Sequence, residues 1–537
     1  MTGVETKGAT RASRYSSAGI VKRAAKLLFQ FTLKVFYGTI VVSNAHFIPE
    51  TGKPCIVCAN HSNSLTDALL LVTSVPSNRR NMLRLTAKST QFGKKTFTSW
   101  LIESAGTVPI HRRKDFDGPV DNSQAMTSLI KALEDGDAVM MFPEGMSRFH
   151  PTIAPLKTGV ARLVSDVLSR HRDDPDFEIN ILNCSITYMH RQHWRSDVLV
   201  TWHPPIILRP KDNPELLEPA EPETIRAVTK QIYTQISSGT FDSPSWHLVQ
   251  SSKLAARMYA PLGTRMSLGD HVRITRTFLE AFKDAHEDSS EDNQPIHPDI
   301  VKVAQLQEDL KAYQHRLISY GIKDDRVRRP LSRREILRRM AIRLFWSCFL
   351  FSISIPGLLL WFPVILTTFY AVHEFKKSGP VFDTFDEIAQ YKLVYGLVSG
   401  ICVWLGGVIL TLPFAMITVL LIPALMWMTL RWMEDCVAST RAFFTLFRLL
   451  RVGKQTLNEM RSLHDVLHRQ IMDLAIALGL PSDPEEFFPQ AGGKEKGRVM
   501  GSWQSKAGYF SIRRRRKRDW NETLRLYDKV DYPDEDS

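Results

Sequence analysis

Two residues in the first part of the chain have the types and spacing of a catalytic base and its partner. His61 follows an apolar segment, and Asp67 lies six residues later, where a helix is expected to begin. A neutral imidazole can accept a proton from an alcohol, and a carboxylate on its other ring nitrogen fixes the tautomer and stabilises the imidazolium. The alcohol can then attack a thioester without a serine or cysteine nucleophile. Taken singly, Asp67 also fits a plain helix N-cap, and His61 fits a polar loop residue.

Three further segments place charged or turn-forming residues directly after apolar stretches. An arginine at a strand end can hold two phosphate oxygens at once. A glutamate followed by glycine lets the backbone turn tightly beside a ligand, and the carboxylate can accept hydrogen bonds from hydroxyl groups. A lysine at the start of the next helix is placed to meet an anion. These candidates are Arg112, then Glu144, Gly145, Ser147 and Arg148, and then Lys157.

The elements that must position these residues alternate along the chain. Between residues 50 and 210, short apolar strands alternate with helical stretches, and this pattern predicts an α/β domain. Strand ends are where such domains collect ligand groups. The expected strands are Cys55–Ala59, Thr107–Ile110, Ala138–Phe142, Asn180–Ile186 and Val198–Trp202, and the expected helices are Asp67–Val75, Phe97–Ala105, Ser123–Glu134 and Leu156–Ser169.

These segments, in this order, resemble the sequence blocks of the phospholipid/glycerol acyltransferase family. The block of Asn-His with a downstream Asp matches at His61 and Asp67, and the second block matches at Gly106 and Arg112. The Phe-Pro-Glu-Gly block matches at residues 142–147, and a fourth block matches loosely at residues 186–205. The resemblance covers roughly residues 30–210, about a third of the chain.

The resemblance implies a fold and a chemistry. The fold is an α/β acyltransferase domain, a mixed sheet flanked by helices. The donor is acyl-CoA, a co-substrate, and no metal or organic cofactor is expected. His61 is the general base and Asp67 its orienting partner. The residues that would bind the phosphorylated acceptor are Arg112, Glu144, Gly145 and Ser147, with Arg148 and Lys157 as the next candidates for its phosphate.

Two details relate the chain to a subset of that family. Five residues separate His61 from Asp67, whereas the commonest family pattern has four. This longer spacing is similar to that of the fungal-type glycerol-3-phosphate and dihydroxyacetone-phosphate acyltransferases, which also carry a segment like Leu156–Ala161 and a C-terminal membrane hairpin. Arg148 and Phe149 stand where the family often has His-Asp, so the acceptor contacts there are expected to differ.

Two uncharged stretches predict a transmembrane helical hairpin. They cover about residues 344–372 and 393–430, and each is long enough to span a bilayer, although the second also has the length to kink or fold back. Arginines are denser on the outer flanks than in the short loop between the stretches. The positive-inside rule therefore predicts that the catalytic domain and both termini are cytosolic and that the loop is lumenal. The protein is expected to be an integral membrane protein of the endoplasmic reticulum.

The remaining segments complete the expected organisation. Polar composition without periodicity predicts disorder at the N-terminus. The hexamer Arg513–Arg518 is typical of a solvated tail, of a contact with anionic lipid, of a signal for retention in an organelle or of a nuclear-import signal. The expected parts are 1–20 disordered, 21–48 an amphipathic or membrane-associated helix, 49–210 the catalytic domain, 211–335 a charged helical region with an acidic loop, 336–435 the membrane hairpin, 436–490 a cytosolic helical segment, and 491–537 a basic tail.

Composition narrows the partners. The net charge is +13, but the basic residues cluster beside the apolar stretches and in the tail, which favours membrane lipids over nucleic acid. Six cysteines in 537 residues indicate a reducing compartment. Cys55 and Cys58 form a C-x-x-C, but on a buried strand they would point to opposite faces, which disfavours a metal or redox site.

The sequence thus predicts acyl transfer from acyl-CoA to glycerol 3-phosphate or dihydroxyacetone phosphate, forming lysophosphatidate for glycerophospholipid synthesis. The alternatives are a lysophosphatidate or other lysophospholipid acceptor and, more remotely, a catalytically silent membrane scaffold. Intact His61 and Asp67 disfavour the scaffold. Acyl-chain preference and oligomeric state are not determined by these patterns.

Overall fold

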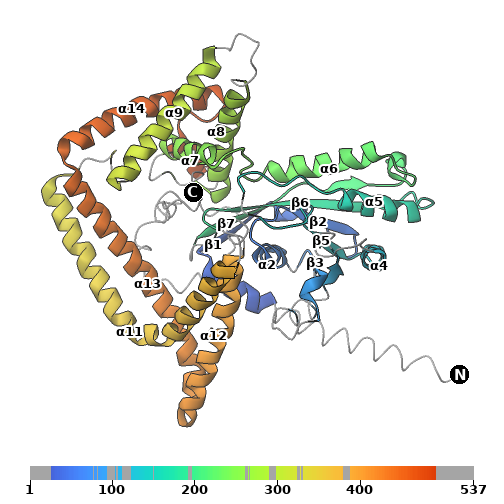
Figure 1. The fold of residues 1–537 in the computed structure, drawn as a ribbon, viewed down its shortest axis with the longest axis horizontal. Helices are drawn as coiled ribbons and strands as arrows, with labels where there is room; N and C mark the ends of the chain where they lie inside the picture. Colours follow the sequence, from blue (N-terminus) through green and yellow to red (C-terminus); the bar gives the residue numbers. More distant parts are fainter. Residues whose placement is uncertain are drawn as a thin grey trace. The chain divides into compact units, whose positions relative to one another are not determined.

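The computed structural model describes residues 26–490, apart from 77, 81–82, 94–98, 100–102, 104–106, 112–121, 149, 192–195, 261–263, 265, 289–297, 323, 325–326, 328–330 and 379–386. The chain divides into two compact units (Figure 1). The first comprises residues 1–188, 194–240 and 385–390, and the second comprises residues 189–193, 241–384 and 391–537.

An eight-stranded mixed sheet forms the centre of the first unit. Its strands are β1 (Thr39–Ser43), β2 (Cys55–Ala59), β3 (Leu83–Lys88), β4 (Val108–Ile110), β5 (Ala138–Met141), β6 (Ile179–Tyr188), β7 (Asp197–Trp202) and β8 (Ile206–Leu208). The order is β1-β7-β6-β2-β5-β3-β4, with β8 paired to β6. The central run β6-β2-β5-β3-β4 is parallel, whereas β7 and β8 pair antiparallel with β6.

Helices cover both faces of this sheet, and the central strands β2 and β5 are apolar throughout. Every residue of β2 is buried, as expected for a parallel strand covered on both sides. Ile56 and Cys58 face a core shared with α4 (Ser123–Glu134), α5 (Gly159–Arg170) and α6 (Pro222–Ser237). Figure 1 shows α6 on one side of the sheet and α2 (Leu65–Ser74) on the other. Three short 3-10 turns join these elements: η1 (Ala45–Phe47), η2 (Ser89–Gln91) and η4 (Pro214–Leu216).

The parallel pairing brings the carboxyl ends of four strands to one edge. Cys58 of β2 pairs with Met141 of β5, so the segments after these strands begin side by side. Ala59 pairs with Cys184 of β6, which continues to Tyr188 beyond that level. Crossover connections between parallel strands place their following loops at the same edge. The predicted site residues that follow β2 and β5, among them His61 and Glu144, therefore lie at this edge.

The first unit differs from the sequence expectation at both ends. The expected amphipathic or membrane-associated helix over 21–48 is only partly found: residues 26–36 are helical, but residues 39–43 form β1, which pairs with β7. The β-branched residues Thr39 to Val42 favour a strand once a sheet edge is present to receive them. The unit also extends past residue 210, because Ile225, Val228 and Ile232 of α6 belong to the sheet's core.

The soluble part of the second unit is helical, as predicted. Four helices surround its core: α7 (Trp246–Tyr259), α8 (Leu268–Asp288), α9 (Pro298–Tyr320) and α14 (Lys454–Ala477). A short helix, α15 (Pro484–Gln490), adds Phe488 to the same core. The predicted acidic loop, the N-terminal segment and the basic tail lie largely or wholly outside the described residues.

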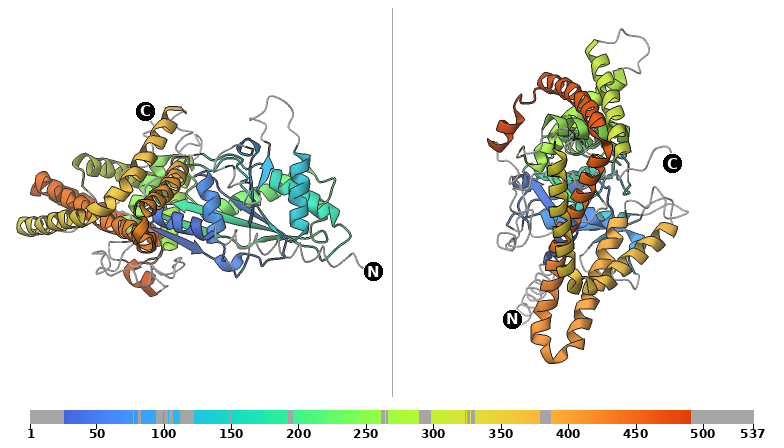
Figure 2. Two further views of the ribbon diagram at one scale, coloured as in Figure 1. Left: turned by 90° about the horizontal axis from the view of Figure 1, so that it is seen from below. Right: turned by 90° about the vertical axis from the view of Figure 1, so that its left-hand side faces the viewer.

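Three helices in the second unit are long and apolar enough to cross a membrane. They are α11 (Arg333–Ser378), α12 (Ile388–Leu410) and α13 (Ala415–Val452). Of the two arrangements that the sequence left open for residues 393–430, the structure shows the one that folds back, because the 3-10 turn η5 (Leu412–Phe414) divides the stretch into two helices. Pro413 in that turn has no backbone N–H to continue the helix. Figure 2 shows α11 and α13 running side by side.

Candidate active site

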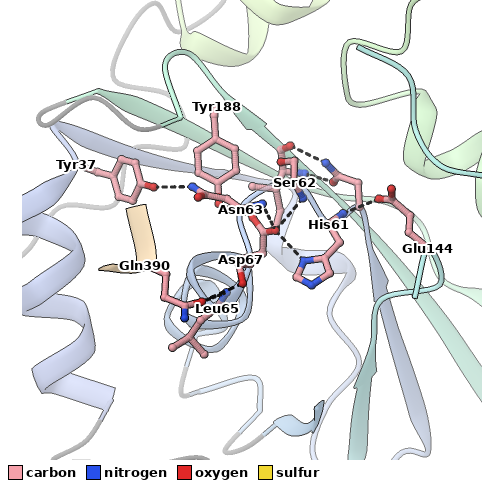
Figure 3. A network of polar contacts seen from close by, with 12 residues as sticks. Tyr37, His61, Ser62, Asn63, Leu65, Asp67, Glu144, Tyr188 and Gln390 are labelled. Carbon is pink, nitrogen blue, oxygen red and sulfur yellow. Dashed lines mark hydrogen bonds and ion pairs between the residues drawn. The ribbon is translucent and has the colours of Figure 1, made fainter. Parts of the chain in front are cut away.

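The predicted base and its partner meet in the structure. His61 lies two residues after β2, and Asp67 lies in the first turn of α2. His61 Nδ1 is 2.9 Å from Asp67 Oδ2, and the Asp67 side chain is completely buried (Figure 3). An ionised carboxylate only accepts hydrogen bonds, so it holds the Nδ1–H tautomer and leaves Nε2 as the ring nitrogen that can accept a proton. This is the arrangement that general-base chemistry needs.

Backbone amides fix the carboxylate as well. Asp67 Oδ2 accepts from the N–H of Ser62 at 2.9 Å and from the N–H of Asn63 at 2.7 Å. The N-cap of α2 is Ser64, whose φ of 46° turns the chain sharply into the helix. Asp67 is thus not the N-cap itself. Its reach back to the preceding loop both stabilises the start of α2 and orients the imidazole.

Two neighbours hold the histidine in place. The ring of Phe142, from the loop after β5, stacks on the imidazole with centroids 3.8 Å apart and planes 8° from parallel. Asn60 exchanges two hydrogen bonds with the backbone of Ile186 in β6, at 3.0 Å and 2.8 Å. The end of β2 is therefore anchored on one side by β6 and on the other by the loop after β5.

Glu144 supports the backbone of the base. Its Oε1 accepts from the N–H of His61 at 2.6 Å, and its Oε2 accepts from the N–H of Ala154 at 3.1 Å. Burial raises the pKa of this carboxyl group, while these two N–H donors act in the opposite direction. The sequence analysis assigned Glu144 to acceptor hydroxyls. The structure shows it joining two loops, and its contact with an acceptor stays a prediction.

The remaining residues of this loop bring two cations near the base. Gly145 has a φ of +74°, and a Cβ there would lie 2.5 Å from Nζ of Lys157, so this lysine side chain crosses directly over the glycine. The N–H of Arg148 donates to the carbonyl oxygen of His61 at 3.2 Å. Arg148 Nε is buried without a hydrogen-bond partner among the described residues. Ser147 lies between them and is half-buried.

Arg112 lies outside the described residues, as does Gly106. Strand β4, which precedes Arg112 in sequence, ends at Ile110 and is parallel to β3. The assignment of Arg112 to the acceptor phosphate therefore stays a prediction.

Two tyrosines complete the network, and the motif did not predict them. Tyr188, the last residue of β6, donates its hydroxyl to Asp67 Oδ1 at 2.5 Å. Burial and the charge of Asp67 raise the pKa of Tyr188 well above its ordinary value, so the hydroxyl stays a donor. Asn63 Nδ2 donates to the Tyr37 hydroxyl at 3.0 Å. Tyr188 lies at the start of the loosely matching fourth block, which was the only available signal.

One contact comes from far along the chain. Gln390 Oε1, in the first turn of α12, accepts from Ser64 Oγ at 2.9 Å and from the N–H of Leu65 at 3.2 Å (Figure 3). It thereby satisfies a backbone donor at the N-terminus of α2. No local pattern in the sequence links residues 326 positions apart.

The two cysteines of the C-x-x-C segment are residues of the hydrophobic core. Cys55 and Cys58 lie on β2 as predicted, and both are buried free thiols. Burial raises the pKa of Cys55 to about 12 and that of Cys58 further, which opposes formation of the thiolate that metal binding or redox exchange requires. Among the described residues, no group of three or more His, Cys, Asp or Glu side chains could hold a metal ion.

Comparison with known proteins agrees with this geometry. The acyltransferase family model matches residues 39–186. The model described as the glycerol-3-phosphate acyltransferase 2 C-terminal domain matches residues 252–482, which include all three apolar helices of the second unit. Together these regions contain the His61–Asp67 pair, the sheet that carries it and the core of the helical unit.

Curated relatives and a solved structure are similar over parts of the chain. Glycerol-3-phosphate O-acyltransferase 2 of Saccharomyces cerevisiae is 23% identical over 69% of this chain and 62% of its own length. Glycerol-3-phosphate O-acyltransferase 1 of the same yeast is 25% identical over 52% of this chain and 36% of its own. The chain therefore spans less than two thirds of these relatives. The 1-acyl-sn-glycerophosphate acyltransferase PlsC from Thermotoga maritima is 18% identical, covering 41% of this chain and 80% of that chain with a TM-score of 0.30.

The His61–Asp67 pair and the loops that hold it lie within the region that is similar to the acyltransferase family, residues 39–186, and residues 252–482 are similar to the glycerol-3-phosphate acyltransferase 2 C-terminal domain.

Proposed function

We propose that this chain is a membrane-bound O-acyltransferase that transfers a fatty acyl group from acyl-CoA to glycerol 3-phosphate, forming lysophosphatidate. Dihydroxyacetone phosphate, the other three-carbon acceptor with a hydroxyl and a phosphate, fits the same proposal. The observation that carries it is the His61–Asp67 pair at the carboxyl edge of an acyltransferase-domain sheet, with Arg148 and Lys157 on the neighbouring loop. The match of the second unit to a glycerol-3-phosphate acyltransferase domain supports this acceptor class.

The proposed reaction is a direct acyl transfer. The acceptor hydroxyl gives its proton to His61 Nε2 as its oxygen attacks the thioester carbonyl carbon, and a C–O bond forms. The C–S bond then breaks, and the imidazolium returns the proton to the CoA thiolate. Asp67 stabilises the charged ring between these steps. No step is assigned to a metal ion or an organic cofactor.

The acceptor phosphate is proposed to lie near the loop that follows β5. Lys157 and Arg148 are held there by hydrogen bonds of their backbone N–H groups to Pro143 and His61. A planar guanidinium can hold two phosphate oxygens, and an ammonium adds a point charge. Arg112 is proposed as a third cation. Ser147 and Glu144 would then face the acceptor's hydroxyl groups.

The site of action is proposed to be the cytosolic side of the endoplasmic reticulum membrane. Three helices with the length and composition of membrane spans support the membrane. The six cysteines, all free, support a reducing side. Fractionation of cells that express a tagged chain tests the organelle.

The test of function is a direct assay of the purified chain in lipid nanodiscs. Acyl-CoA is offered with glycerol 3-phosphate, dihydroxyacetone phosphate or lysophosphatidate, and free CoA and acylated product are both measured. We expect product with the three-carbon phosphates and a fall of roughly 100- to 10,000-fold in His61→Ala. His171→Ala, at the C-terminal end of α5, serves as the matched control and should keep full activity.

Product from lysophosphatidate alone would move the assignment to the second acylation. Unchanged turnover in His61→Ala, with the variant folded, would refute the general-base mechanism.

A further inference from the structure

The uncharged stretch Leu393–Leu430 folds back on itself. In the second unit, the C-terminal part of α12 and the N-terminal part of α13 lie side by side and meet at the turn η5 (Figures 1 and 2). Trp404 Nε1 donates to the carbonyl oxygen of Val419 at 3.1 Å. A Cβ on Gly407 would lie 2.7 Å from Ile422 Cδ1. The two helices therefore form a closely packed antiparallel hairpin.

The tip of this hairpin is apolar. Around the turn, Leu410 is 87% exposed and Met416 is 91% exposed. The tip contains no charged or amide side chain from Leu410 to Met416. A turn that emerged into water on the far side of a bilayer would be expected to carry polar residues, as loops at protein surfaces do. Exposed leucine, phenylalanine and methionine instead match hydrocarbon.

The turn also satisfies its own polar groups, which a segment within hydrocarbon must do. Thr411 Oγ1 donates to the carbonyl oxygen of Gly407 at 2.7 Å and lies 2.9 Å from Thr418 Oγ1. The N–H of Phe414 donates to the carbonyl oxygen of Thr411 at 2.8 Å. Pro413 has no N–H to satisfy. The turn is therefore compatible with an environment without water.

Helix α11 approaches the tip and then turns away from it. As far as Trp361, its partners descend along α13: Ser347 contacts Thr440, and Trp361 Nε1 donates to the carbonyl oxygen of Met426 at 2.9 Å. From Thr368 onward, its partners ascend along α12: Thr368 Cγ2 is 3.6 Å from a Cβ placed on Gly396. Pro356 and Pro363 interrupt the helical hydrogen bonding around this change of partner, which accounts for the bend.

The C-terminal end of α11 and the start of α12 lie together, away from the tip. The rings of Phe375 in α11 and Tyr391 in α12 stack with centroids 4.2 Å apart. The residue before Tyr391 is Gln390, which is bonded to Ser64 beside the catalytic histidine. The first residues of α12 therefore belong to the unit that contains His61 and Asp67. Charged residues flank the apolar parts of the three helices: Arg333, Arg334, Glu335, Arg338, Arg339, Arg343, Glu374, Lys376, Lys377, Lys392, Arg431, Glu434, Asp435, Arg441, Arg448 and Arg451.

We infer that α11, α12 and α13 enter the bilayer from the side of the catalytic unit and leave it on that same side. The uncharged part of α12, Leu393–Leu410, is about 27 Å long at about 1.5 Å per residue, which is shorter than the roughly 30 Å hydrocarbon core even when upright. The exposed apolar surface of these helices contacts lipid hydrocarbon, and the tip of the hairpin lies inside the hydrocarbon core. The connection between α11 and α12 is then not lumenal, in contrast to the expectation from flanking charge.

This arrangement has a consequence for the catalytic loop. Gln390 is covalently continuous with a helix that is embedded in lipid, and it accepts hydrogen bonds from the first residues of α2. The N-terminus of α2 carries Asp67. Gln390 therefore connects the first turn of α12 to the first turn of α2, which carries Asp67. This part of the inference depends on the proposed function only for its chemistry, and the topology can be tested without an activity assay.

Cysteine labelling in sealed microsomes tests the topology of the full chain. Three single variants are compared with the unsubstituted chain, whose native cysteines give the background: Lys377→Cys at the end of α11, Met416→Cys at the tip, and Lys131→Cys on the exposed side of α4 as the catalytic-side reference. The probe is a membrane-impermeant maleimide, added before and after the vesicles are permeabilised. Denaturation in detergent then confirms that each introduced thiol can react.

We expect Lys377→Cys and Lys131→Cys to react equally in sealed vesicles. Met416→Cys should react at least about tenfold more slowly from either side, because a thiol in hydrocarbon does not form the reactive thiolate. The inference is overturned if Lys377→Cys reacts only after permeabilisation while Lys131→Cys reacts before it. It is also overturned if Met416→Cys becomes reactive once the far side is opened.

Discussion

Asp67 is the side chain of the candidate site for which the structure describes the largest number of hydrogen bonds. It accepts hydrogen bonds from His61 Nδ1, from the amides of Ser62 and Asn63, and from the Tyr188 hydroxyl. A buried carboxylate is costly unless such donors compensate its lost hydration. The same four bonds that make its burial tolerable also fix the direction in which it presents an acceptor to the imidazole.

The prediction at this scale is made for Tyr188→Phe. The ring stays, including its packing near Tyr37, but Asp67 Oδ1 loses its donor. We expect kcat to fall about tenfold, equivalent to about 1.4 kcal/mol, because the orienting carboxylate is held less firmly. The KM for acyl-CoA should be unchanged. Initial rates with each substrate varied in turn provide the measurement.

Tyr320→Phe, at an exposed position at the end of α9, is the matched control and should behave as the parent. If Tyr188→Phe lost thermal stability but kept its kcat, the hydroxyl would be a core hydrogen bond without influence on the base.

At the scale of elements, the loop between β5 and α5 joins the base to the proposed phosphate cations. Phe142, Glu144 and Arg148 contact His61 through its ring, its N–H and its carbonyl oxygen. Gly145 gives this loop its sharp turn, and Lys157 lies against it. The loop conformation therefore sets the position of the histidine and the lysine together.

Gly145→Ala tests that coupling. A side chain at a φ of +74° costs roughly 1–2 kcal/mol, and the new Cβ would collide with the Lys157 ammonium group. We expect a lower melting temperature and a several-fold higher KM for the phosphorylated acceptor. Acceptor titrations and a thermal melt measure the two effects.

The matched control is Gly159→Ala at the start of α5, where a Cβ would meet nothing within 4 Å. That variant should keep the parental KM. Equal effects of the two substitutions would show that the Gly145 turn has no specific connection to acceptor binding.

At the scale of the whole molecule, the two units have separate cores and separate sensitivities to pH. His271 on α8 is buried in the second unit, and its Nδ1 has no hydrogen-bond partner among the described residues. Burial lowers the pKa of His271 to about 3, and the nearby charges of Arg257 and Lys253 lower it as well. The folded unit therefore keeps this imidazole neutral while the unfolded chain protonates it below its ordinary pKa.

The sign of the pH effect follows from that difference. The unfolded state binds the extra proton as the pH falls from about 6.5 towards 3, so stability of the second unit is lost over this interval, by about 1.4 kcal/mol per pH unit. We expect the melting temperature of the second unit to fall between pH 6.5 and 4.5, and to fall less in His271→Gln. Scanning calorimetry of the full chain measures it.

His315→Gln on the exposed side of α9 is the control and should retain the parental pH dependence. An identical slope in His271→Gln and the parent would place the acid sensitivity of the unit elsewhere.

The sequence by itself determined the parts of the protein that depend on neighbouring residues. It predicted the bounds of β2 as observed and those of β5, β6 and β7 to within one or two residues, because apolar runs bounded by turn-forming residues carry that signal locally. It also predicted that His61 and Asp67 act as a pair, because a strand end followed by a helix start brings residues six apart to one place. The family blocks lie on these same strand ends.

Only the tertiary structure decided which distant residues complete the site and how the apolar helices are arranged. Tyr188 and Gln390 reach the dyad region from 121 and 326 residues away, across separations at which side-chain pattern carries no information. The run 27–42 became helix and strand because β7 offered an edge for β1. The uncharged stretch 393–430 gave no periodic signal for its break, since hydrophobicity is uniform on both sides of Pro413. The packing of α12 and α13 on α11 determined that it folds back.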